Sequence, residues 1–441
     1  MNVKNWFDKI IIALLALSIA SLIIRKGNFM ITFFPKPFEI LIVIMIGVFI
    51  ASLILKKTNI KELISLVPSK ILLAILGLIM STIVGWLITI LWKDININSD
   101  MIFDFGRLIL AILVFIFVII YTIKYQDSFK YYFFALLSPI LYTISIFLPK
   151  IAIQYNLVLD DGRFYGLMNN PSTVSKLILI SLLFSFSLYL FEHKNKLSKI
   201  CFFVTTIGLM SLIFWSGTRA AMLSSFIGFA LIIFLYVKYN FSKKNILVAL
   251  TSVFLIFFIG FLITPDFSKK IIINRVFTQN VNNLTALDLK NTKTINVFKK
   301  TIGTKSSGTP ETRLTIWPYF IKKIIKNPLG MGPAYYTHTF TRVGPNNDLA
   351  GAHNSFLEIM LYGGWVAIVS FLFLLIIAIK NLVFSIKYNI DKKIPVALLG
   401  ALVALTIALL FDDHFRLYWF WILLALSISY KYTIQEIKAT E

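Results

Sequence analysis

Long apolar runs recur along the whole chain and set the strongest limit on its fold. Twelve runs of 14–25 residues are each bounded by charged residues or by Pro, Gly or Asn. A helix needs about 20 mainly apolar residues to cross the core of a bilayer, so we expect the shorter runs to extend into their flanks. The runs are Ile10–Ile24, Phe38–Leu55, Ile71–Trp92, Leu108–Ile123, Tyr131–Leu148, Thr173–Phe191, Ile200–Phe214, Ala220–Val237, Ile246–Thr264, Ser355–Ile379, Pro395–Phe411 and Leu417–Tyr430.

The composition agrees with a membrane protein. The chain is 58% apolar and 14% charged, with a mean hydropathy of +0.83, whereas soluble domains average about 45–50% apolar and about 25% charged residues. These values exclude a cytosolic globular enzyme, a disordered protein and a disulfide-stapled module, and Cys201 is the single cysteine. The sequence predicts an all-α polytopic membrane protein of about 12 transmembrane helices, with one large external loop containing surface helices.

The basic residues in the loops predict the orientation of the chain. One set of alternating loops holds 16 Lys and Arg, and the other set holds 9 together with several aspartates. Short cytoplasmic loops are enriched in basic residues, so the first set and both termini are predicted to be cytoplasmic. The basic set is 56–70, 124–130, 192–199, 238–244 and 380–393.

The same topology divides the chain into four parts. Residues 1–160 form N-terminal transmembrane helices, and residues 161–264 form helices that carry the RFYG and SGTR sequences. Residues 265–354 form the large external loop, with 13 basic and 4 acidic residues, and residues 355–441 form C-terminal transmembrane helices. A surface of this charge attracts anionic ligands or headgroups.

One amphipathic helix is predicted inside the external loop, over residues 309–327. Thr309 can cap it and Pro310 suits its first turn. Lysines lie away from the apolar face, and Pro318 is expected to kink the helix. The apolar face consists of Trp317, Phe320, Ile321, Ile324 and Ile325. The turn-rich sequence NPLGMGPAYY (327–336) then leads to the next span.

Arginines on the predicted external side are the first candidates for a ligand site. Arg219 lies between two spans after almost no loop, and the preceding Gly217 favours a buried anion contact over an interfacial anchor. Arg313 lies four residues before Trp317 and so projects along the apolar face of the surface helix, although it can also pair with an acid. Arg163 is either a ligand contact or a partner of neighbouring aspartates, and Arg342 is a further candidate binding residue.

His353 is the sharpest single candidate. It lies where the external loop enters the membrane, and Glu358 follows inside the predicted span. A neutral imidazole is a usable general base near pH 7, and an acid inside a span is a functional candidate by default. A structural role for His353 is the competing interpretation.

The sequence lacks the motifs that are typical of nucleotide binding and of metal-dependent catalysis. There is no P-loop, dinucleotide-binding glycine motif, HExxH or metal-spaced His/Cys set. The pairs Asp160-Asp161 and Asp412-Asp413 can be read as metal ligands, but solvated loop ends fit them better. We therefore expect no cofactor and no metal. The net charge of +23 is ascribed to cytoplasmic loops and an anionic ligand rather than to nucleic acid.

Four blocks in order resemble the O-antigen ligase and polymerase family. They are RFYGLMNNPSTVSKL (163–177), SGTRAAMLSSFIGF (216–229), TRLTIWPYFIKKIIKNPLGMGPAYY (312–336) and AHNSFLEIMLYGGWVAIVSFLFLL (352–375). The resemblance covers roughly residues 160–380. The family often has a glycine where this chain has Ala367, a change that keeps the residue small.

The resemblance implies a membrane glycosyltransferase that moves a glycan from undecaprenyl diphosphate to an acceptor hydroxyl, with inversion and without metal. Arg219 and Arg313 match arginines thought to hold the diphosphate, His353 matches an essential histidine, and Arg163 matches less tightly. The implied partners are an undecaprenyl diphosphate-linked oligosaccharide or polysaccharide, a glycan or lipid A–core acceptor, membrane lipid and a chain-length regulator. The implied location is the bacterial cytoplasmic (inner) membrane, with the active site facing outward.

Three functions remain open at this point. A polymerase, whose acceptor is another lipid-linked repeat, is favoured because nothing indicates recognition of a core oligosaccharide. A ligase, whose acceptor is lipid A–core, shares the same motifs. A polysaccharide flippase would also have many spans, but should show related halves and ionisable groups in mid-span.

Overall fold

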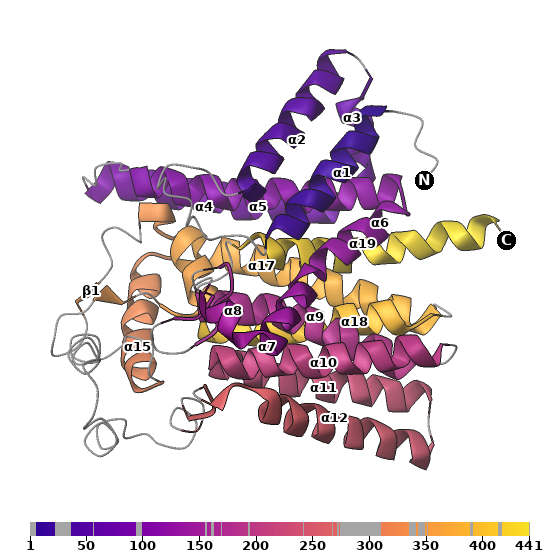
Figure 1. The fold of residues 1–441 in the computed structure, drawn as a ribbon. Helices are drawn as coiled ribbons and strands as arrows, with labels where there is room; N and C mark the ends of the chain where they lie inside the picture. The colour runs from indigo at the N-terminus through magenta and orange to yellow at the C-terminus, as the bar shows by residue number, and fades with distance from the viewer. Residues whose placement is uncertain are drawn as a thin grey trace.

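The chain folds into a bundle of long helices, as the apolar runs predict (Figure 1). The computed structural model describes residues 6–22, 37–55, 57–93, 99–154, 157–159, 163–168, 170–192, 195–240, 242–266, 268–270, 273, 310–334, 341–342, 349–350, 352–388, 391–412 and 417–440. Within these residues, ten helical segments are long and apolar enough to cross a membrane. The prediction of an all-α polytopic membrane protein is confirmed.

Each of the ten candidate spans overlaps one predicted run. They are α2 (Pro37–Ile54), α4 (Ser69–Lys93), α5 (Ser99–Lys124), the segment of α6 (Ser128–Leu136), η1 (Ser138–Thr143) and α7 (Ile144–Phe147), α9 (Pro171–Phe191), α10 (Lys196–Ser216), α11 (Arg219–Tyr239), α12 (Lys243–Ile263), α17 (Ser355–Tyr388), and α18 (Lys393–Ala408) with η3 (Leu409–Phe411). The first and last runs form α1 (Trp6–Ser21) and α19 (Tyr418–Thr440), which are not among the ten. The count of twelve spans therefore stays a prediction.

The remaining described elements are short or lie across the end of the bundle. They are α3 (Ile60–Leu66), α8 (Pro149–Gln154), α15 (Pro310–Lys326), η2 (Gly332–Ala334), β1 (Thr341–Arg342) and β2 (Leu349–Ala350). The two strands pair antiparallel, with Thr341 opposite Ala350. Figure 1 shows α15 running across the end of the bundle, crosswise to α10 and α12.

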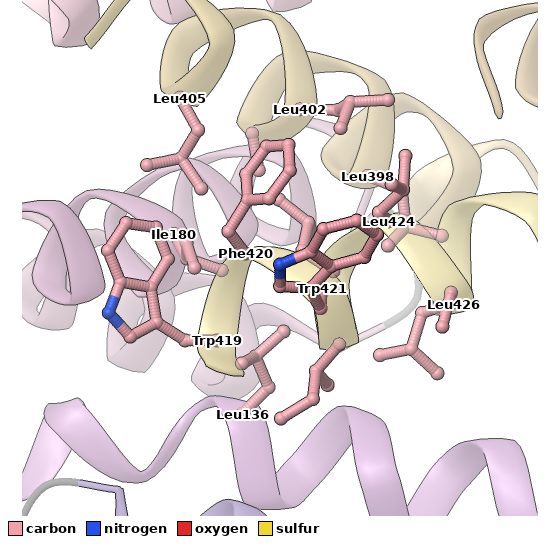
Figure 2. Close-up of a cluster of buried hydrophobic side chains, with 14 of the residues drawn as sticks. Leu136, Ile180, Leu398, Leu402, Leu405, Trp419, Phe420, Trp421, Leu424 and Leu426 are labelled. Atoms are coloured by element: carbon pink, nitrogen blue, oxygen red, sulfur yellow. The ribbon is translucent and has the colours of Figure 1, made fainter. Parts of the chain in front are cut away.

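The core of the bundle lies around α9 and the first half of α19, which are mainly apolar and buried on almost every side. Helices α10, α11 and α18 pack around α9, while α19 packs against α5, α17 and α18. Figure 2 shows the aromatic side chains at the start of α19 among leucines of α18 and Ile180 of α9. A helix that is apolar all round belongs inside a larger bundle. One cluster of buried residues runs from α1 to α19, and the division into four parts stays a prediction.

Helix α17 is broken at Gly363 and Gly364. Gly364 has φ +64° and ψ −153°, a conformation that only glycine adopts readily. Two hydrogen bonds to the loop after α15 serve the backbone groups at the break. The Met331 N–H donates to the Leu361 carbonyl at 2.6 Å, and the Trp365 N–H donates to the Pro328 carbonyl at 3.1 Å. Irregular backbone inside a membrane protein requires such internal partners, so the loop and the break depend on each other.

The loop fits against α17 and α4 because the chain has glycine at the crossing. A Cβ at Gly364 would lie 2.0 Å from the Pro328 carbonyl oxygen, and one at Gly330 would lie 2.6 Å from the Gly364 nitrogen. On α4, a Cβ at Gly85 would lie 2.8 Å from the Leu329 carbonyl oxygen. Residues 328–332 of the turn-rich sequence predicted to lead to the next span therefore lie between α4 and α17.

Candidate active site

Arg219 is the first residue of α11, directly after a tight turn. Gly217 ends α10 in the left-handed conformation with φ +61°, which lets the chain reverse within two residues. The hydroxyl of Thr218 donates to the Pro171 carbonyl at 3.3 Å and does not cap α11. The Arg219 side chain is exposed, whereas the sequence favoured a buried one. A cation at a helix N-terminus adds to the positive end of the helix dipole, so this position favours an anion.

The segment that carries Arg163 lies against the end of α10, just before the same turn. The Phe164 N–H donates to the Trp215 carbonyl at 3.1 Å, and the two aromatic rings pack with centroids 5.1 Å apart. Gly166 adopts φ +56° against the ring of Tyr142, whose hydroxyl accepts from the Leu167 N–H at 3.3 Å. The Arg163 side chain is half-buried. The structure therefore brings together the segments that carry Arg163 and Arg219, which are 56 positions apart in the sequence.

A buried lysine and an aspartate join the start of α9 to the segment after α18. The Lys176 side chain is completely buried, and its ammonium group pairs with the Asp412 carboxylate and contacts the Ser172 hydroxyl at 3.0 Å. The Ser172 hydroxyl also donates to the Asp412 carboxylate. Asp412 was predicted to be a solvated loop end, and this prediction is wrong because the buried cation holds its carboxylate, whose side chain is 15% exposed.

His353 precedes the N-cap of α17. The Asn354 side chain accepts hydrogen bonds from the N–H groups of Phe356 at 2.9 Å and Leu357 at 3.1 Å, so it caps the helix. His353 has φ +45°, which is rare for a residue with a side chain, and its side chain is half-buried. Glu358 lies in the first turn of α17 and is completely buried. Its position near the helix N-terminus favours a negative charge.

Helix α15 packs against the residue immediately before His353. The Trp317 indole N–H donates to the Ala352 carbonyl at 3.0 Å. Phe320 and Ile324 are buried, as the predicted helix requires, but Ile321 is 45% and Ile325 is 68% exposed. The buried stripe is thus narrower than the predicted apolar face, because α15 touches the bundle along one side only. The helix continues through Pro318.

The other candidates are placed in part or lie outside the described residues. Arg313 lies on α15 and Arg342 on β1, but their side chains are not among those described. Asp160, Asp161 and Asp413 lie outside the described residues. In the part of the chain that the structure describes, no group of three or more His, Cys, Asp or Glu side chains is placed to hold a metal ion.

A continuous set of contacts therefore joins the candidate segments at one end of the bundle. The Arg163 segment touches the end of α10, and the turn between α10 and Arg219 touches the start of α9. Through Asp412, the start of α9 connects to α17, because the Ser355 hydroxyl donates to the Asp412 carbonyl at 2.6 Å. Trp317 completes the set by joining α15 to Ala352.

Comparison with protein families identifies the central part of the chain. Residues 201–372 match the family model described as O-Antigen ligase. This match agrees with the resemblance of this region to the O-antigen ligase and polymerase family. No curated protein matches the chain by sequence. The matched segment begins in α10 and ends in α17, so it contains Arg219, α15, His353 and the break at Gly364.

The family match indicates the general kind of activity. The protein is a multi-pass membrane protein, and the match supports a glycosyltransferase-like enzyme of surface polysaccharide assembly. In general terms, the match implies a lipid-linked glycan and an acceptor as substrates. Arg163, Lys176 and Asp412 lie outside the matched residues, so their place beside the matched segment comes from the structure alone.

Sequence reasoning missed Lys176 and the break in α17, although both left a signal. Lys176 is a charged residue inside a predicted span, and such residues are functional candidates by default. The break coincides with a pair of adjacent glycines in the middle of a long apolar run. Neither signal identifies the partner, Asp412 in one case and the loop of residues 328–331 in the other, because these contacts join distant parts of the chain.

Proposed function

We propose that the protein transfers a glycan from undecaprenyl diphosphate to an acceptor sugar hydroxyl, with inversion, at the outer face of the cytoplasmic membrane. The observation that carries the proposal is a series of contacts, through the start of α9 and Asp412, that links four segments at one end of the bundle. These segments are those of Arg163 and Arg219, the helix α15, and the start of α17 with His353. Three of these segments lie in the residues that match the O-antigen ligase family.

The arginines supply the electrostatic part of the mechanism. A diphosphate gains negative charge as the bond to the anomeric carbon breaks, and guanidinium groups stabilise that charge through bidentate hydrogen bonds. Arg219 stands at the N-terminus of α11, where the helix dipole acts in the same direction. We assign Arg219 and Arg313 to the diphosphate, and Arg163 and Arg342 to the phosphate or the sugars near it.

His353 supplies the acid–base part. Its neutral imidazole takes the proton of the acceptor hydroxyl while the oxygen attacks the anomeric carbon and the diphosphate leaves on the opposite side. One displacement of this kind inverts the anomeric centre. Glu358 lies one turn into α17 from the cap and is assigned to the substrate-binding residues of the same end.

The acceptor is what separates a polymerase from a ligase. We favour a polymerase, in which the acceptor is another lipid-linked repeat and a chain-length regulator is a partner. The alternative is a ligase with a lipid A–core acceptor. In either case the termini are proposed to be cytoplasmic and the site external, as the loop charges predict.

A reconstituted reaction tests the proposal. The purified full chain is incubated with undecaprenyl diphosphate-linked oligosaccharide in excess EDTA and without ATP. We expect longer lipid-linked products with the donor alone, and glycan on lipid A–core only if the protein is a ligase. Absence of transfer to either acceptor contradicts the proposal. Movement of the donor across vesicles without a new glycosidic bond would instead identify a flippase.

A further inference from the structure

Lys176 is a buried cation that the proposed reaction does not use. Its side chain has no exposed surface although it lies near the start of α9, and burying a charge is costly unless the charge is paired. The pairing is provided by Asp412, with the Ser172 hydroxyl between the two groups on the same helix as the lysine. A lysine at this depth therefore has a specific task in holding Asp412.

Asp412 holds the start of α17 through a second, independent contact. Its carboxylate binds Lys176 and Ser172 of α9, while its backbone carbonyl accepts the hydrogen bond of Ser355 at 2.6 Å. Ser355 is the first residue of α17, two positions after His353. The lysine thus fixes the backbone that receives α17.

His353 is held between two such contacts. On its N-terminal side, Trp317 of α15 binds the Ala352 carbonyl, and on its C-terminal side Ser355 binds Asp412. The backbone of His353 has φ +45° between these two points. A strained conformation of this kind persists only where the surroundings determine it, so both contacts are needed to set the imidazole.

We propose that Lys176 is a positioning residue for His353, acting through Asp412 and Ser355. This inference rests on the proposed function, because it assigns the lysine to the acid–base step of that reaction. Removing the ammonium group releases one of the two points that hold His353 and lowers the rate of transfer without removing any group that contacts the donor. Misplacement of a catalytic group by about 1 Å costs about 10²-fold in rate.

The test compares Lys176→Met with a matched variant at the opposite end of the bundle. Lys393 pairs with Glu192 at 3.0 Å at the start of α18, the opposite end of that helix from Asp412. Lys393→Met therefore removes an ion pair without touching His353. We expect kcat of Lys176→Met to fall about 10²-fold with the KM for the donor nearly unchanged. Lys176→Arg keeps the charge and should recover much of the rate, and Lys393→Met should match the wild type.

A double-mutant cycle separates positioning from a general effect on stability. If Lys176 acts through His353, then Lys176→Met should have little further effect in a His353→Gln background. Multiplied effects of the two substitutions would overturn the inference. If Lys176→Met alone does not insert, Lys176→Met/Asp412→Asn removes both charges. We expect that variant to insert and still show the low kcat, whereas wild-type kcat would overturn the inference.

A labelling measurement decides the inference even if no transfer is seen. Ala352 is 1% exposed, so Ala352→Cys in a Cys201→Ala background should react slowly with a maleimide. We expect Lys176→Met to raise that reaction rate several-fold and Lys393→Met to leave it unchanged. Equal rates in all three proteins would overturn the inference, while a lack of transfer by the wild type would count against the proposed function alone.

Discussion

The two ends of the bundle both contain paired lysines, but the pairs connect different things. At the end predicted to be cytoplasmic, Lys393 pairs with Glu192 at 3.0 Å, and Lys124 pairs with the buried Asp8 at 2.9 Å. Each of these pairs joins two segments. At the opposite end, the pair of Lys176 and Asp412 joins α9, the segment after α18 and, through Ser355, α17. A lysine–carboxylate ion pair therefore joins two neighbouring segments at one end, and joins three segments of the candidate site at the other.

The surroundings of the cations differ in the same way. At the lysine-rich end, burial raises the pKa of the Tyr125 hydroxyl, which therefore remains a donor to Asp8. There, Lys392 lies 4.9 Å from the ring centroid of Tyr239, so aromatic faces also receive lysines. At the other end, Arg219 is exposed at a helix N-terminus. The lysines named here therefore pair with acids and aromatic rings, whereas the exposed position of Arg219 fits the proposed anion site.

The largest difference between the two ends is expected in their reaction with an impermeant thiol reagent. In a Cys201→Ala background, we expect Asn283→Cys in the external loop to react with an impermeant thiol reagent in intact spheroplasts. Lys243→Cys, in a predicted cytoplasmic loop and exposed, should react only after lysis. The reverse pattern would contradict the assigned orientation and with it the external site.

Removal of the arginines should have the largest effect on activity. An arginine that stabilises a departing phosphate is worth about 10³–10⁵-fold in rate, so Arg219→Ala and Arg313→Ala should each leave almost no transfer at normal protein levels. Arg219→Lys should recover little, because lysine lacks the planar fork. Arg107 is a matched control: it is exposed, pairs with Asp104 at 3.5 Å, and Arg107→Ala should be active. Full activity of both site variants would remove the proposed anion site.

Substitution of His353 should have the next largest effect. A general base contributes about 10²–10⁴-fold, and His353→Ala should lose that factor in the chemical step while the donor still binds. The rate of the wild type should rise with pH through a value near the ordinary histidine pKa, about 6.5, because only the neutral imidazole accepts a proton. His353→Gln keeps hydrogen bonding without basicity, and near-normal turnover by this variant would leave His353 as a positioning residue.

The smallest effect is expected at the break in α17, where the substitution changes stability and not the reacting groups. Gly364→Ala places a Cβ against the Pro328 carbonyl, and the backbone conformation alone costs about 1–3 kcal/mol for a residue other than glycine. We expect a lower thermal unfolding temperature in detergent. A Cβ at Gly47 in α2 would meet no neighbouring element within 4 Å, so Gly47→Ala should be neutral or slightly stabilising. Equal unfolding temperatures of the two variants would show that the break accommodates a residue with a side chain at position 364.

Much of the fold followed from the sequence, since membrane insertion depends on local composition. Ten of the predicted runs correspond to candidate spans, and α15 occupies residues 310–326 within the predicted 309–327. The buried side of α15 was less predictable. Ile321 and Ile325 share the apolar character of Ile324 but are exposed, because burial depends on where α17 lies and not on the helix's own pattern.

The candidate site was predictable as a set of segments and not as an arrangement. The sequence identified Arg163, Arg219, Arg313 and His353 by their charge, their position at the ends of apolar runs and their resemblance to family blocks. Charge and position at the end of an apolar run are local properties of the sequence, so they can be recognised without knowing how the helices pack. Three contacts could be seen only in the tertiary structure. They are the contact of Phe164 with Trp215, the pair of Lys176 with Asp412, and the hydrogen bonds of residues 328–331 at the break in α17. Each joins residues far apart in the sequence, where one hydrogen bond or ion pair is favourable only after the helices that carry both partners have packed.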